Sequence, residues 1–221
     1  MKTHVKGIKM ITHCPKDDLL LSYSAGALGE SWSLAVGSHV QMSKEASDDV
    51  ALGEKIGGGL LSDLAPVSLE KSFDAVLDRL GDQEPIGEAV EPEQKALVPS
   101  PLCDYIGDSL ENLEWSKVGN GIAQHLIETS DSGQARLLRI PPGTALPEHG
   151  HSGRELTLVI SGGYRDDSGS YSRGDIADID DGLGHQPIAD EGEDCICLIV
   201  TDTPVKFKGI LPRILQPFIR I

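Results

Sequence analysis

Apolar residues recur at helical spacing through most of the first eighty residues of the chain. Gly29 is a break between the first two segments, and three consecutive glycines interrupt the third without ending its pattern. Ser68 is expected to cap the fourth segment, and Gly81 to end it. The pattern predicts a small helical bundle within residues 1–85. Its helices are expected over 17–28, 31–46, 44–61 and 68–80.

The composition changes after this bundle. Residues 86–101 contain three prolines and three glutamates against one lysine, which predicts an acidic, Pro-rich linker. From Leu102 onward, short β-rich runs such as ARLLRI, LTLVISGG and DCICLIVTD alternate with turn residues. The pattern therefore predicts a multidomain α + β protein, with a β-sandwich or barrel over residues 102–221.

The charge of the chain narrows the choice of partner. There are 19 basic and 35 acidic side chains, so the net charge is −16. Such a chain is a poor direct ligand for nucleic acid or an anionic membrane, and a basic protein is the partner that its charge favours. No apolar stretch approaches the length of a membrane span, and the N-terminus lacks the apolar core of a signal peptide. We therefore expect a cytoplasmic protein.

Three residues that can bind a metal lie close together in the β-rich half. His149 and His151 are two residues apart, so on an extended segment both imidazoles project to one face, and Glu155 follows. Two solvated histidines in a Gly-rich turn would give the same local pattern. The wider spacing favours a site, because these residues lie between Gly143 and Gly162 in the order G-x5-HxH-x3-E-x6-G.

This order resembles the first signature motif of the cupin superfamily. The second cupin motif is matched in part, since His185 stands at its ligand position, while Asp180 replaces a proline and Ala189 an asparagine. The resemblance implies a double-stranded β-helix, or jelly roll, in which His149, His151, Glu155 and His185 bind one metal ion.

Three imidazoles and a carboxylate suit a divalent transition metal, and zinc is the ion we expect first. A closed tetrahedral site would be structural or sensory, whereas an ion with open positions would indicate catalysis.

The cysteines show no disulfide framework. Cys195 and Cys197 share one face of a predicted strand, where packing is the expected role and a response to oxidation is the alternative. His125 lies among apolar residues and is expected to be structural.

A helical front, an acidic linker and a C-terminal cupin together resemble the ChrR-type anti-sigma factors. The segment LLLSYSAGALGESWSLAVGSHV resembles the first two helices of that family's sigma-binding domain, and the C-terminal residues from 194 onward resemble its last strands. The resemblance implies an extracytoplasmic-function sigma factor as the partner, bound through residues 1–85. Six apolar residues are candidates for its core or its sigma contact: Leu20, Leu21, Tyr23, Leu28, Trp32 and Val36.

The sequence departs from the zinc motif of that helical domain. His39 occupies the histidine position, but Ser43 and Ala46 stand where the family has cysteines. Neither residue is a good zinc ligand, although His13 and Cys14 are near the remaining position. We therefore expect the helical domain to fold without zinc, and His39 to be a helix-surface or cap residue.

The resulting hypothesis is an anti-sigma factor that is not an enzyme, with a metal-binding cupin that senses a stress such as oxidation. The alternative is a metal-dependent cupin enzyme, such as a small-molecule dioxygenase or isomerase. A metal-storage or structural cupin is a third interpretation.

Overall fold

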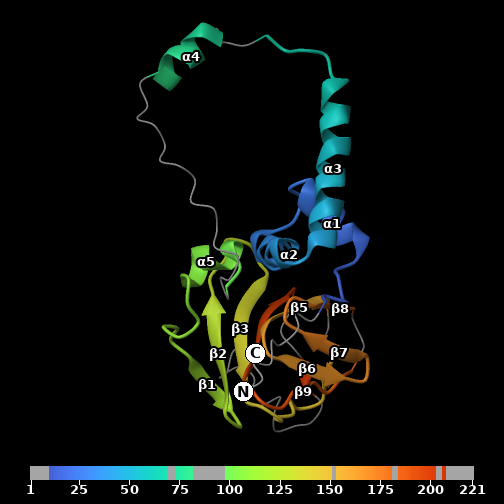
Figure 1. Cartoon of the computed structure of the whole chain (residues 1–221), viewed down its shortest axis with the longest axis vertical. Helices are drawn as coiled ribbons and strands as arrows, with labels where there is room; N and C mark the ends of the chain where they lie inside the picture. The colour runs from blue at the N-terminus through green and yellow to red at the C-terminus, as the bar shows by residue number, and fades with distance from the viewer. Residues whose placement is uncertain are drawn as a thin grey trace, which may run out of the picture.

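The computed structural model describes residues 10–68, 73–81, 98–150, 153–180, 184–202 and 206–207. Five helices are present in these residues (Figure 1). They are α1 (Asp17–Ser24), α2 (Glu30–Met42), α3 (Lys44–Ser62), α4 (Phe73–Gly81) and α5 (Ser100–Ile106). We refer to α1–α4 as the helical unit.

The first three predicted helices are confirmed. The backbone changes direction between α2 and α3 at Ser43, whose hydroxyl accepts a hydrogen bond from the Ala46 N–H at 3.3 Å and so caps α3. α3 continues through its three glycines to Ser62. The fourth helix is described from Phe73 to Gly81, and residues 69–72 lie outside the described ranges, so the cap at Ser68 stays a prediction.

Strands fill the C-terminal half, which we call the β unit. They are β1 (Ser116–Gly119), β2 (Ile122–Ile127), β3 (Gln134–Ile140), β4 (His149–Gly150), β5 (Glu155–Ser161), β6 (Gly163–Asp166), β7 (Gly169–Ser172), β8 (Ile176–Ile179), β9 (Ile188–Ala189), β10 (Cys195–Thr201) and β11 (Lys206–Phe207). A six-stranded sheet has the order β1-β2-β3-β10-β5-β8, a three-stranded sheet the order β7-β6-β9, and β11 pairs with β4. Every ladder in these residues is antiparallel.

The two faces of the six-stranded sheet bury different sets of side chains. Strand residues alternate between faces, so in β10 Leu198 belongs to one apolar cluster and Cys197 to the other. In β5, Leu156 and Leu158 lie in the first cluster, and Val159 lies in the second, inside the β unit. Both faces are buried, which explains the nearly continuous apolar runs of these two strands.

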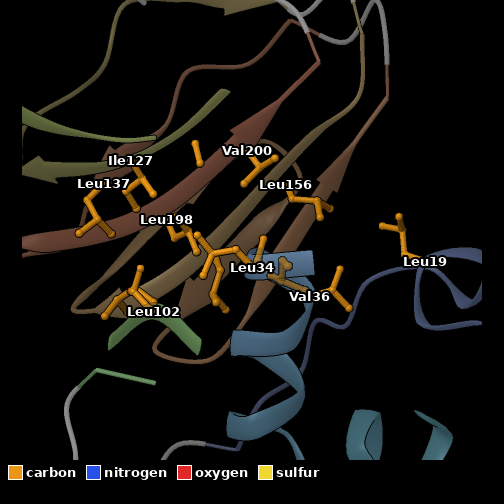
Figure 2. Close-up of a cluster of buried hydrophobic side chains, with 14 of the residues drawn as sticks. Leu19, Leu34, Val36, Leu102, Ile127, Leu137, Leu156, Leu198 and Val200 are labelled. Carbon is orange, nitrogen blue, oxygen red and sulfur yellow. The ribbon is translucent and has the colours of Figure 1, made fainter. Parts of the chain in front are cut away.

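The helical unit shares the first of these clusters instead of having a core of its own. α2 packs on β5 and β10, and its Leu34 and Val36 lie beside Leu156 and Leu198 (Figure 2). The loop between β2 and β3 also reaches α2, where the Asp131 carboxylate accepts hydrogen bonds from the backbone and hydroxyl of Ser31. The apolar face of α2 is therefore buried against the sheet, and the helical unit and the β unit share one apolar cluster.

The predicted linker also ends earlier than residue 101. Val98 is buried, and α5 begins at Ser100 and buries Leu102 in the shared cluster. Pro101 lies in the first turn of α5, where its missing N–H has no helical acceptor to lose. Residues 86–97 of the predicted linker lie outside the described ranges.

The six apolar candidates of the helical unit divide between core and surface. Leu20 and Val36 are buried, Leu21 is exposed, and the other three are partly buried against the shared cluster. More apolar surface is exposed on α3 and α4, where several large side chains are at least 46% exposed. They are Leu52, Ile56, Leu60 and Leu61 on α3, and Phe73, Val76 and Leu77 on α4. None of the helices described here is long and apolar enough to cross a membrane.

Candidate metal centre

Two of the predicted ligands, His149 and His185, face each other inside the β unit. Their backbones form an antiparallel bridge, in which each N–H donates to the other residue's carbonyl at 3.1 and 3.0 Å. Both residues are buried, and their Nε2 atoms are 3.1 Å apart. Two segments that are far apart in the sequence therefore bring two imidazole nitrogens to one point.

The outer nitrogens of both rings face acceptors. The Nδ1 of His149 donates to the Pro147 carbonyl at 2.8 Å, and the Nδ1 of His185 donates to the Asp166 carboxylate at 2.9 Å. These acceptors favour the tautomers with the proton on Nδ1, which leaves a lone pair on each Nε2. Burial lowers the pKa of His149 to about 4, so its ring is neutral at pH 7. In metal-binding histidines, one ring nitrogen typically faces the ion while the other ring N–H donates a hydrogen bond to a protein acceptor. The pair of His149 and His185 has this arrangement and fits a divalent transition metal.

Glu155 begins β5 in the same unit. It shares a strand face with Thr157 and Val159, and the Thr157 hydroxyl donates to its carboxylate at 3.1 Å. Burial raises the pKa of Glu155 to about 7, against the opposing effects of the Thr157 hydrogen bond and of the charge of Arg136. A buried carboxylate in this position is stabilised by a nearby cation.

The full set of four ligands stays a prediction. His151 lies outside the described residues. Within the described ranges, no three His, Cys, Asp or Glu side chains are arranged to hold a metal ion, so Glu155 does not complete a site with the histidine pair alone. Asp166, which orients His185, was missed by sequence reasoning, because a supporting carboxylate on a hairpin has no fixed spacing from the ligand.

The motif glycines are explained by backbone geometry. Gly162 has φ +68°, and a Cβ there would lie 2.6 Å from the Asp194 carbonyl oxygen. Of the two departures from the second cupin motif, Asp180 accepts a hydrogen bond from Lys16 at 2.6 Å, and Ala189 is buried in β9. Both residues therefore have structural roles in this chain.

The cysteine pair lies on the inner face of β10. Cys195 and Cys197 are both buried with their Sγ atoms 3.5 Å apart, and they pack in the inner apolar cluster. The neighbouring Cys195 thiol and burial raise the pKa of Cys197 well above its usual value. Both side chains are packed as the sequence predicts, and the Cys197 thiol is protonated at neutral pH.

His39 is not at the helix surface, and that prediction is wrong. Its side chain is fully buried between α2 and the turn before β8, and its Nδ1 donates to the Gly174 carbonyl at 2.9 Å. The cause is the docking of α2 on the β unit, which covers the face that carries His39. Ser43 caps α3 and Ala46 is buried, so both positions that replace cysteines have structural roles.

Of the two residues near the remaining ligand position, His13 packs against the Tyr171 ring and Cys14 is exposed.

Helices that dock on an antiparallel β unit, with a histidine pair inside that unit, are consistent with a helical domain followed by a cupin. Residues 107–205 match the family described as ChrR Cupin-like domain. The anti-sigma-E factor ChrR of Cereibacter sphaeroides is 40% identical over 215 residues, which cover 96% of this chain and 99% of that protein. In the crystal structure of Rhodobacter sphaeroides SigE in complex with the anti-sigma ChrR, the matching chain has a TM-score of 0.76 at 37% identity. The match covers 87% of this chain and 100% of that one.

This chain therefore belongs to the ChrR family of anti-sigma factors. The predicted fold class, helices followed by a cupin, is confirmed. The prediction of a regulator and not an enzyme is confirmed as well, because the relative that matches nearly the whole chain is an anti-sigma factor.

Proposed function

We propose that this chain binds an extracytoplasmic-function sigma factor and keeps it inactive, and that its cupin unit binds a divalent metal and senses a stress such as oxidation. The observation that carries the first part is the exposed apolar surface of the helical unit. Leu52, Ile56 and Leu60 recur every four residues along α3, so they form one stripe on its surface. Surfaces of this kind on a helix are typical of partner binding.

α4 supports the same conclusion. Phe73, Val76 and Leu77 share one face of the helix and are exposed. The related complex of SigE with ChrR supplies the kind of partner, and the acidic charge of this chain complements a protein that binds DNA through basic surfaces.

The sigma contact is tested with substitutions on the stripe of α3. We expect Ile56→Asp and Leu60→Asp to weaken co-purification with the sigma factor by about tenfold or more, because a carboxylate is then buried at an apolar contact. Ser47→Asp is the control, since it adds the same charge at an exposed position on the same helix. Equal retention of the sigma factor by all three variants would refute this contact surface.

The second part of the proposal concerns the metal, for which zinc is the first expectation. The residues that would bind it are His149, His151, Glu155 and His185. The same unit contains the buried cysteine pair of β10, whose thiols are the groups that an oxidant would modify. A sensor works by linkage, because a change at the metal alters sigma affinity only through a different arrangement of the two units.

Metal analysis of the purified full chain tests this part. We expect about one zinc ion per chain, lost in the variant His149→Ala with His185→Ala and retained in His39→Asn. The His149→Ala variant should still bind the sigma factor but should not release it in response to the oxidant. Zinc that is lost from His39→Asn instead would place the metal in the helical unit and contradict the proposal.

A further inference from the structure

Arg154 joins the β unit to α1 through two carboxylates. Its Nε and Nη2 atoms donate to the two oxygens of Asp178 at 2.7 and 2.6 Å. Its Nη1 and Nη2 atoms also donate to the two oxygens of Asp18, in the first turn of α1, at 2.7 and 3.2 Å. One guanidinium therefore bridges β8 and the helical unit with four charge-assisted hydrogen bonds.

The two halves of this bridge differ in their exposure to solvent. The Asp178 side chain is 6% exposed, whereas that of Asp18 is 62% exposed. Water competes with the contact to Asp18 and screens its charge, so that contact is the weaker of the two. Arg154 is therefore fixed to the β unit by Asp178, and its bond to α1 is the one that can open.

Other contacts hold the N-terminal segment to the β unit independently. The buried Asp175 carboxylate accepts the backbone N–H groups of Thr12 and His13 at 2.6 and 2.9 Å. Lys16 pairs with Asp180 at 2.6 Å. Opening the contact between Arg154 and Asp18 would consequently loosen the first turn of α1, while Leu19 and Leu20 stay buried in the shared cluster and keep the helix attached.

Arg154 is also covalently next to a predicted metal ligand. It immediately precedes Glu155, the first residue of β5, so the two Cα atoms are separated by a single peptide unit. A cation bound at the predicted site would stabilise the buried Glu155 carboxylate beside Thr157 and Arg136, which already act on it. Loss of that cation would raise the cost of burying this charge, and a shift of Glu155 in response would move the start of β5 and the Arg154 backbone with it.

We infer that Arg154 is a positioning residue that transmits the state of the cupin metal centre to α1. This inference rests on the proposed function, since it deepens how the cupin would alter sigma affinity. α1 packs closely on α3, where a Cβ at Gly53 would lie 2.5 Å from the Ser24 hydroxyl. A change in the position of α1 therefore reaches the helix that carries the exposed apolar stripe.

The test compares Asp18→Asn with Asp17→Asn in the full chain. Both remove one charge from the first turn of α1, but of the two carboxylates only that of Asp18 pairs with Arg154 among the described residues. Hydrogen exchange of the α1 amides is measured without sigma factor, with zinc bound and after chelation. We expect chelation to speed exchange in the unsubstituted chain and in Asp17→Asn by about fivefold or more. Asp18→Asn should exchange at the fast rate already with zinc bound.

Sigma affinity supplies a second measurement on the same proteins. Chelation should change the affinity of the unsubstituted chain and of Asp17→Asn, and the change should be reduced at least several-fold in Asp18→Asn and in Arg154→Lys. Identical exchange of α1 in Asp18→Asn and Asp17→Asn would overturn the inference. An unsubstituted chain whose sigma affinity ignores chelation would instead refute the sensing function, and the exchange measurement would still decide the role of Arg154.

Discussion

His39 shows how a single residue changes its role when two units dock. Its ring is buried at the contact between α2 and the β unit, and its Nδ1–H bonds the Gly174 carbonyl. Among the described residues, no hydrogen-bond partner faces its Nε2 atom. Burial lowers the pKa of His39 from 6.5, because the charged imidazolium would be poorly solvated there, so the native ring is neutral.

This lowered pKa predicts a pH dependence of stability. Below pH 6.5 the unfolded chain binds a proton at His39 and the native chain does not, so the free energy of unfolding falls as the pH decreases toward the native pKa. His39→Asn, which cannot titrate, should reduce the loss between pH 7.5 and pH 5.5 by up to about 1 kcal/mol. Urea unfolding at the two pH values measures this change in the free energy of unfolding, and His125→Asn is the control for removing one histidine. An equal loss in the unsubstituted chain and in His39→Asn would show that His39 carries no such linkage.

Among the helices, α4 differs from the others because none of its described apolar side chains is buried. Its large side chains Phe73, Val76 and Leu77 are exposed, whereas α2 and α5 bury apolar side chains in the shared cluster. A helix of 9 residues is marginal in water by itself, since nucleation is unfavourable and tertiary packing supplies most helical stability. α4 is therefore expected to gain its stability from the sigma factor.

Hydrogen exchange measures this gain. In the free chain the amides of α4 should exchange within about tenfold of the rate of an unfolded peptide, while those of α2 are strongly protected. Binding of the sigma factor should slow exchange in α4 by about a hundredfold or more. Protection of α4 that is equally strong in the free chain would argue that its apolar face is already covered.

At the scale of the molecule, the shared apolar cluster joins the first three helices and α5 to the β unit. Side chains from α1, α2, α3 and α5 lie in the same cluster as those of β3, β5 and β10. The two tryptophans, Trp32 in α2 and Trp115 before β1, both pack against it.

This arrangement predicts one unfolding transition. The variants Trp32→Phe and Trp115→Phe each leave a single tryptophan as a fluorescent reporter, one in each unit. In each variant, we expect the urea midpoint from tryptophan fluorescence to coincide with the midpoint from circular dichroism. The reason is that neither unit keeps its core without the other. An earlier transition reported by Trp32 would show that the helical unit unfolds separately.

The sequence alone determined those features that depend on local pattern or fixed spacing. The starts of α2 and α3, the β-rich second half and the motif positions of His149, Glu155 and His185 belong to this class. Helical periodicity and the glycines of tight turns are properties of a few neighbouring residues, so one sequence is enough to read them.

Only the tertiary structure decided which surfaces meet. The burial of His39, the orientation of His185 by Asp166 and the bridge from Arg154 to Asp18 each join residues that are distant in the chain. The sequence pattern of the apolar face of α2 is the same whether the helix packs on other helices or on a sheet. Hydrophobic burial is non-directional, so the local sequence does not indicate which element covers that face.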